Sequence, residues 1–105
     1  MPKHTRKSAG GTSFHGVKFK ATPQQLINLF PNSYDEQNDG RDKVNFDFTL
    51  ETESGKVFTI YDWKYYRPLD LNEQVVFHIG GRSWMQTFEA GKLLNSALAK
   101  KLQES

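Results

Sequence analysis

The sequence of 105 residues contains no cysteine and no long apolar run. The lack of cysteine excludes disulfides, thiolate nucleophiles and metal sites with Cys ligands, and it suits a reducing compartment. No segment approaches the roughly 20 apolar residues that span a bilayer, and the amino terminus lacks the apolar centre of a signal peptide. We therefore expect a cytoplasmic protein without membrane contact.

Hydrophobic residues make up 36% of the chain, charged residues 25% and aromatic residues 13%. This composition is typical of a folded domain, and the length suits one core to which aromatic side chains contribute much of the volume. The formal net charge of +2 is too small to identify a partner by itself.

Residues 1–13 are basic and show no hydrophobic period. They carry Lys3, Arg6 and Lys7, followed by small polar residues. This pattern predicts a flexible basic arm ahead of a single domain over residues 14–105. The arm could reach a phosphate backbone, or it could be a solvated terminus with no ligand.

Alternating residues predict strands over 14–20, 44–51, 57–63 and 74–79. Thr22 and Gln25 form a capping box around Pro23 and predict a short helix that Pro31 ends, and Ser83 begins a long helix that runs to Leu102. Residues 34–42 read as a polar loop. The order strand-helix-strand-strand-strand-helix predicts an α+β domain with a central antiparallel meander and a long C-terminal helix.

The strand over 57–63 has apolar residues on both of its faces. Val57, Tyr61 and Trp63 alternate with Phe58 and Ile60. Strands of this kind are usually interior strands that are covered on two sides, so we expect helices packed on the sheet.

The segment Tyr61-Asp62-Trp63-Lys64-Tyr65-Tyr66-Arg67-Pro68 is the densest mixture of aromatic and charged residues in the chain. Aromatic rings offer stacking surfaces, and cations attract phosphates or carboxylates. Strand alternation assigns Tyr61 and Trp63 to the core, beneath a helix. It leaves a contact edge, which would act together with the basic residues of the arm; the edge consists of Lys64, Tyr65, Tyr66 and Arg67.

Gly80, Gly81, Arg82 and Ser83 join the last strand to the long helix. Glycines before a helix amino terminus can admit a phosphate, because unpaired N–H groups and the helix dipole favour an anion there. The other interpretation is that the glycines form a sharp turn and that Ser83 only caps the helix.

An acid pair depends on how the central hairpin turns. If Ser54 and Gly55 form a two-residue turn, Asp47 lies across from Asp62, with Lys64 on the same face. This arrangement resembles the core of PD-(D/E)xK nucleases, and the resemblance implies that the acids hold Mg²⁺ and that the lysine assists the attacking water. A turn centred one residue away would separate the acids.

Three functions remain after this reading. The first is a small non-catalytic protein that contacts nucleic acid through the aromatic-basic edge and the arm, and that needs no cofactor or metal. The second is a protein-interaction or inhibitor domain that uses the same aromatics, with or without a nucleotide at Gly80-Gly81. The third is the Mg²⁺-dependent nuclease. The histidines in strands, His15 and His78, are expected to be hydrogen-bonded sheet residues. The oligomeric state stays open, a homodimer included.

Overall fold

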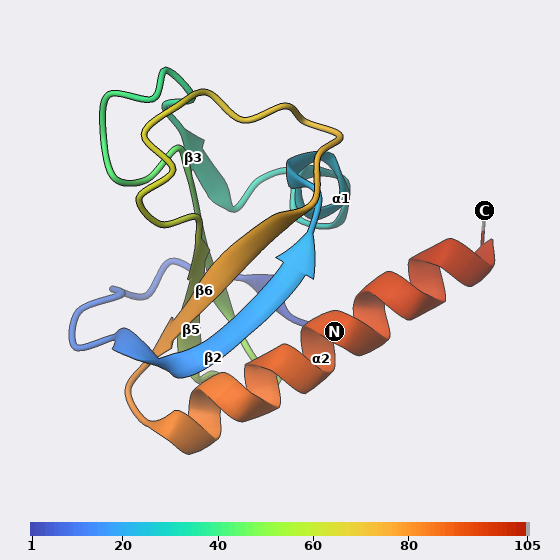
Figure 1. Cartoon of the computed structure of the whole chain (residues 1–105). Helices are drawn as coiled ribbons and strands as arrows, with labels where there is room; N and C mark the ends of the chain where they lie inside the picture. The colour runs from blue at the N-terminus through green and yellow to red at the C-terminus, as the bar shows by residue number, and fades with distance from the viewer. Residues whose placement is uncertain (105) are drawn as a thin grey trace.

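Six antiparallel strands form one sheet in the computed structural model, which describes residues 1–104 (Figure 1). The strands are β1 (Lys3–His4), β2 (Ser13–Ala21), β3 (Tyr34–Glu36), β4 (Phe46–Glu51), β5 (Val57–Tyr61) and β6 (Val75–Gly81). Their order across the sheet is β1-β4-β5-β6-β2, and β3 also pairs with β4. The predicted α+β fold and its antiparallel meander are confirmed, and the short strands β1 and β3 are additions to it.

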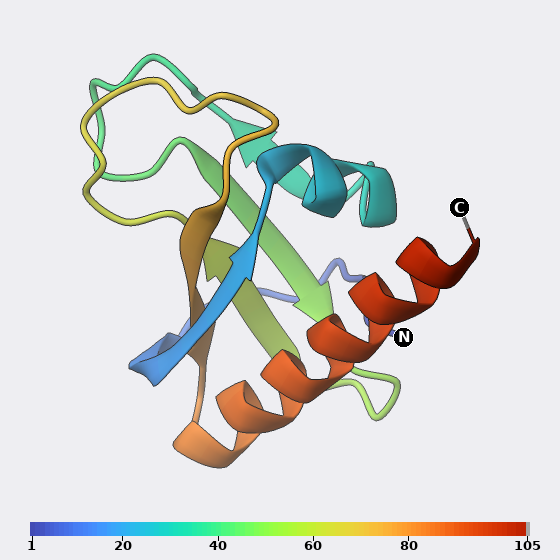
Figure 2. The ribbon, with the colours of Figure 1, turned by 45° about the vertical axis from the view of Figure 1, so that its right-hand side comes forward.

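Two helices lie on one side of this sheet (Figure 2): α1 (Pro23–Leu29) and α2 (Trp84–Glu104). The capping box predicted for α1 is present, since Thr22 Oγ1 accepts a hydrogen bond from Gln25 N and Gln25 Oε1 accepts one from Thr22 N. Neither helix is both long enough and apolar enough to cross a membrane within the described residues.

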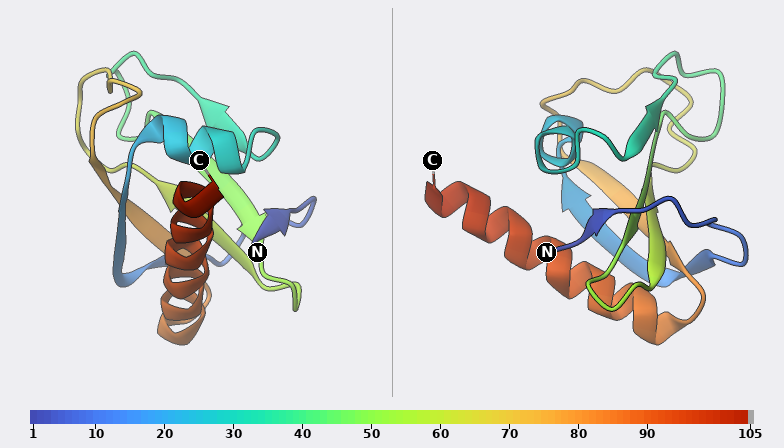
Figure 3. Two further views of the ribbon diagram at one scale, coloured as in Figure 1. Left: turned by 90° about the vertical axis from the view of Figure 1, so that its right-hand side faces the viewer. Right: turned by 180° about the vertical axis from the view of Figure 1, so that it is seen from behind.

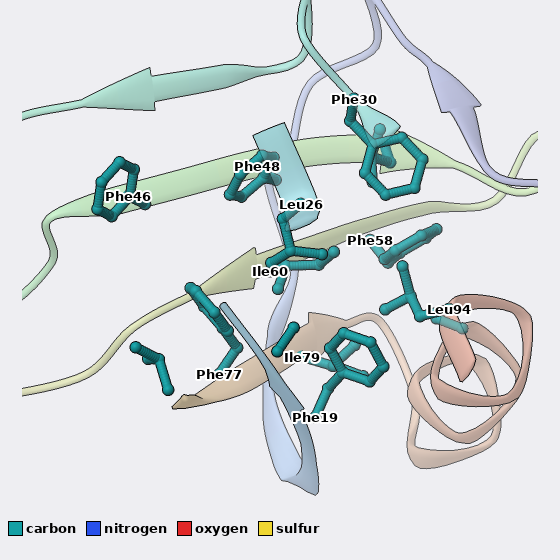
Figure 4. Packing of buried hydrophobic residues seen from close by; sticks show 14 of the residues in the cluster. Phe19, Leu26, Phe30, Phe46, Phe48, Phe58, Ile60, Phe77, Ile79 and Leu94 are labelled. Atoms are coloured by element: carbon teal, nitrogen blue, oxygen red, sulfur yellow. The ribbon is translucent and has the colours of Figure 1, made fainter. Parts of the chain in front are cut away.

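The core fills the space between the sheet and the two helices. Phe46, Phe48 and Leu50 occupy alternate positions of β4, and Leu26 and Leu94 reach them from the helices (Figure 4). These five side chains are fully buried. Burial of these large apolar side chains therefore holds both helices against one face of the sheet. The other face is not covered by either helix.

The prediction of an interior strand covered on both sides is confirmed for most of β5, since it lies between β4 and β6 and Val57–Ile60 are buried. Helices cover only one of its two faces. Tyr61 and Val57 point to the face without helices, which we call the helix-free face, because they pair with Asp47 and Glu51 of β4. Val57 is nevertheless buried there.

The amino-terminal segment covers the end of the helix-free face at which β5 begins (Figure 3). Lys7 Nζ lies 3.0 Å from Glu51 Oε2 and 2.8 Å from the carbonyl oxygen of Gly55, and Arg82 donates to the carbonyl oxygens of Ser8 and Gly10. Residues 1–13, which we expected as a flexible arm, thus contribute strand β1 and contact the domain. Their mobility in solution stays a prediction.

The register predicted for the central hairpin is wrong by one residue. Glu51 pairs with Val57 and Asp47 with Tyr61, and Thr52 N donates to the carbonyl oxygen of Lys56. The loop therefore has three residues and ends on Gly55, whose φ of 86° is the left-handed conformation that such loops require. Because side chains alternate, this shift places Asp62 on the face opposite to Asp47.

Removal of the Leu94 side chain should test how α2 is held. We expect Leu94→Ala to lower the free energy of unfolding by about 3 kcal/mol, because it leaves a cavity between α2 and the sheet. The neighbouring exposed substitution Asn95→Ala should change it by less than about 0.5 kcal/mol. Urea denaturation followed by circular dichroism measures both, and equal losses would contradict this packing.

Candidate functional site

Four rings form a continuous group on the helix-free face, which we call the aromatic cluster: Phe14, Tyr61, Trp63 and His78. Phe14 stacks on His78 with 4.0 Å between ring centroids and 16° between ring planes. Tyr61 lies 5.6 Å from His78 and 5.9 Å from Trp63, and Trp63 lies 6.3 Å from His78. Aromatic side chains from three strands and one loop therefore meet at one place on the surface.

Sheet register explains why these rings meet. Tyr61 and His78 are directly opposite each other in the β5–β6 pair, and Phe14 is opposite Gly80 in the β6–β2 pair. The β2–β6 register shifts after Phe14, and Gly16, with a φ of 94°, lies in this irregular part of β2. Without the shift, Phe14 would lie opposite Arg82; the shift places it opposite Gly80, two residues from His78 along β6 and on the same face.

The aromatic cluster ends in two exposed rings. Phe14 and Trp63 each keep 39% of their surface in solvent, whereas Tyr61 and His78 are partly buried between them. Exposed rings that are already held by neighbouring rings offer surfaces for stacking at little cost in side-chain entropy.

Gly80 allows β6 to pack closely against β5. A Cβ atom at Gly80 would collide with Thr59 Oγ1, whereas its 3.5 Å distance to Tyr61 Cε1 would be an ordinary contact. The glycine therefore makes room for the Thr59 side chain, which lies directly opposite in the β5–β6 pair.

Three lysines surround the aromatic cluster, and we call them the platform lysines. Lys43 Nζ and Lys64 Nζ lie 5.8 and 5.6 Å from the centroid of Trp63, and Lys18 pairs with His78 across β2 and β6. Within residues 1–104, none of the three forms an ion pair with a carboxylate. The cluster is thus bordered by cations whose charge is available to an anionic ligand.

Burial, together with nearby charges, shifts three pKa values on this face. Burial and the nearby Lys18 ammonium lower the pKa of His78 below its usual range, so this imidazole is neutral at pH 7. Burial and the Asp47 carboxylate raise the pKa of Tyr61. Desolvation, with smaller contributions from Asp35 and Asp62, raises the pKa of Asp47. The face is cationic on the side of β2 and acidic beyond β5.

A buried carboxylate fixes the loop that carries Trp63. Asp62 is fully buried, and its two oxygens accept hydrogen bonds from Asn45 N, Phe46 N and Asn45 Nδ2 at 2.7 to 3.1 Å. The Asn45 amide also donates to the carbonyl oxygen of Arg67 at 3.1 Å. A carboxylate with this many donors is a structural group that holds two loops together.

The same two loops are joined by two further hydrogen bonds and one close backbone contact. Asn38 donates to the carbonyl oxygen of Leu69 at 2.8 Å and accepts from Leu69 N at 2.6 Å. Within the 37–45 loop, Asn45 Oδ1 accepts from Gly40 N. A Cβ atom on Gly40 would lie 2.6 Å from Arg67 Cα, so only glycine fits this contact. The 37–45 and 62–73 loops therefore form one unit.

The turn after β5 alternates the directions of its side chains. Lys64 and Tyr66 have positive φ angles of 59° and 52°, which are uncommon outside glycine. Lys64 N donates to the carbonyl oxygen of Lys43 at 2.8 Å, which holds this conformation. As a result Trp63 and Tyr66 face solvent, while Tyr65 turns inward against the core.

The predicted contact edge is divided by this turn. Tyr65 uses its hydroxyl to accept from Val76 N at 3.1 Å. Arg67 forms two hydrogen bonds with Glu73, at 2.7 and 2.8 Å, and these hold the pKa of Glu73 down to about 2. Tyr66 is 55% exposed. Of the predicted edge, only Lys64 belongs to the platform lysines around the aromatic cluster.

The basic residues of the amino-terminal segment do not join the aromatic cluster through any described contact. Lys3 lies in β1, at the far edge of the sheet beyond β4. Lys7 is paired with Glu51, and Arg6 is exposed. A role for these three cations in binding stays a prediction.

The predicted phosphate site at Gly80-Gly81 is not an open loop. Both glycines lie inside β6 and pair with β2, because β6 extends two residues further than its hydrophobic pattern indicates. Arg82 binds carbonyl oxygens of the amino-terminal segment, and Ser83 caps α2 by accepting from Gln86 N at 3.2 Å. These contacts favour the structural interpretation of this segment.

The residues of the nuclease hypothesis are separated. Asp47 lies opposite Tyr61 on the helix-free face, whereas Asp62 points into the protein and its oxygens are occupied by N–H donors. The acid pair that carried the resemblance is therefore absent. Within residues 1–104, no group of three or more His, Cys, Asp or Glu side chains is arranged to hold a metal ion.

Sequence reasoning missed four members of this site. Tyr61 and Trp63 were assigned to the core, His78 was treated as an ordinary sheet residue, and Phe14 was read only as the start of a strand. The available signal was the alternation along β6, which places His78 on the other face of the sheet from the apolar residues Phe77 and Ile79. Comparisons with protein-family models, curated proteins and solved structures find no match to this chain.

Loss of the Asp62 carboxylate should destabilise the whole protein. We expect Asp62→Ala to lower the free energy of unfolding by about 3 kcal/mol, because two buried backbone N–H groups lose their acceptor. Asp62→Asn should also destabilise, since its amide group would face those donors. Glu36→Gln, at an exposed position of β3, is the control. A melting temperature unchanged by either Asp62 substitution would contradict the structural role.

His78 should make stability depend on pH. Its pKa is lower in the folded protein than in the unfolded chain, so the unfolded chain binds more protons as pH falls below about 6.5. Stability should therefore decrease through that range and level off below the folded pKa. Urea denaturation between pH 5 and 7.5 measures this change, and His78→Gln should reduce its slope. An identical slope in the variant would assign the effect to other groups.

Proposed function

We propose that this protein binds nucleic acid, without catalysis, through the aromatic cluster and the platform lysines. The observation that carries the proposal is the position of Trp63. Its side chain is 39% exposed, and its ring contacts the rings of Tyr61 and His78 at centroid distances of 5.9 and 6.3 Å. Two lysine ammonium groups lie within 6 Å of the ring centroid. An exposed ring among unpaired cations suits a ligand that has both flat rings and negative charge.

The distribution of ion pairs supports the same ligand. Lys7 and Arg67 have carboxylate partners, and Arg82 is held by carbonyl oxygens, so these cations are committed to the fold. The platform lysines, by contrast, lie beside the aromatic cluster and have no carboxylate partner among the described residues. The lack of cysteine further supports a cytoplasmic location, where nucleic acids are present.

A protein partner is the second candidate for this face, because exposed aromatic residues also anchor protein interfaces. The unpaired lysines favour a polyanion over an apolar partner surface. Sensitivity to salt separates the two candidates, since binding to phosphates weakens steeply as salt rises and binding dominated by apolar contacts does not.

Neutralisation of the platform lysines should weaken nucleic-acid binding. Fluorescence anisotropy with labelled single-stranded and duplex oligonucleotides would compare the wild type with the triple variant Lys18→Gln, Lys43→Gln, Lys64→Gln. We expect a loss of tenfold or more at 50 mM salt, and a slope of log K against log salt that is smaller by about 2.

The control carries the same change in net charge on the helical side of the protein. It combines Lys92→Gln, Lys100→Gln and Lys101→Gln, all on α2, and should bind as the wild type does. Equal losses in the two triple variants would show that only net charge matters. Failure of the wild type to bind any of the probes would remove the proposal.

A further inference from the structure

The two exposed rings of the aromatic cluster are arranged for more than one base. Phe14 and Trp63 lie at its two ends, with His78 in contact with both, at 4.0 and 6.3 Å between centroids. Each exposed ring can accept one stacked base. A chain that runs across β2, β6 and β5 would therefore place successive bases on Phe14 and Trp63.

The charges follow the same line. Lys18 lies on the β2 side of the cluster, opposite His78, and Lys43 and Lys64 lie at the Trp63 end. Beyond Tyr61 the face becomes acidic, with Asp47 opposite Asp35 across β4 and β3. The platform lysines attract a phosphate backbone, and Asp47 and Asp35 repel it. These two acids therefore limit how far a bound strand can extend across the face.

A duplex does not suit this surface. Stacking on a side chain needs the flat face of a base, which is covered by its neighbours in a double helix. Reading a duplex through its major groove requires a helix or a two-stranded ribbon that enters the groove. Here α1 and α2 both lie on the opposite side of the sheet from the cluster (Figure 2).

From this geometry, and resting on the proposed function, we infer that the ligand is single-stranded nucleic acid, of which two neighbouring bases stack on Phe14 and Trp63. DNA and RNA share the chemistry that this surface recognises, namely base faces and phosphates. Selectivity for single strands then comes from the rings, while the platform lysines contribute affinity for any nucleic acid.

Three probes of equal length test this inference: a mixed-sequence 12-nucleotide single strand, the same sequence as a duplex, and an abasic 12-mer that keeps the phosphates but lacks bases. The single strand should be tested as DNA and as RNA. We expect the single strand to bind at least about tenfold more tightly than the duplex or the abasic chain. In a Trp84→Phe background, bound single strand should also quench the fluorescence of Trp63.

Substitutions of the rings should remove the preference for single strands. Trp63→Ala and Phe14→Ala should each weaken single-strand binding by about tenfold and leave duplex binding nearly unchanged. Trp84→Ala, which removes another exposed tryptophan on α2, is the matched control and should retain the preference. Circular dichroism melting confirms that each variant is folded, and Trp63→Phe should restore part of the affinity.

The outcomes separate this inference from the proposed function. If the single strand, the duplex and the abasic chain bind equally and the platform-lysine variant weakens all of them, the protein binds nucleic acid but the inference is overturned. A preference for single strands that survives Trp63→Ala and Phe14→Ala would overturn it as well. If no probe binds, both proposals fail.

Discussion

The carboxylate of Asp62 is the contact on which the rest of the candidate site depends. It lies at the end of β5, directly before Trp63, and accepts hydrogen bonds from the backbone at the start of β4. Asn45 extends this contact to the loop that carries Arg67. A fully buried carboxylate is tolerated only where hydrogen-bond donors surround it. The same hydrogen bonds fix the backbone before Trp63 and Lys64 and so position these two residues.

The two faces of the sheet have different roles. One face packs apolar side chains against two helices and forms the core of the fold. The helix-free face is covered at one end by the amino-terminal segment and carries the aromatic cluster at the other. Lys7 and Arg67 are paired with carboxylates, whereas Lys43 and Lys64 lie beside the exposed Trp63 ring and Lys18 lies opposite His78. This combination of cations and exposed rings distinguishes the candidate site from an ordinary polar surface.

The elements of the fold could be predicted because their signals are local. Alternation gave β4 and β6, and the capping boxes located the starts of α1 and α2. The hairpin loop was misjudged by one residue, since a two-residue and a three-residue loop that both end on Gly55 differ only in whether Glu53 pairs with Lys56 or belongs to the loop. This difference of one residue places Asp47 and Asp62 on opposite faces of the sheet, because each step along a strand reverses the face.

The sequence by itself determined the α+β class, the order of the elements and the presence of a dense aromatic and basic segment. Only the tertiary structure decided which of those aromatics are exposed. Tyr65 turns inward and Trp63 outward because Lys64 and Tyr66, on either side of Tyr65, adopt left-handed conformations. Hydrogen bonds from Lys64 N to Lys43 and from Val76 N to the Tyr65 hydroxyl join this turn to distant segments. Phe14 and His78 join Trp63 through strand pairing between residues far apart in the chain. Neither kind of contact leaves a local pattern, because both depend on which strands become neighbours.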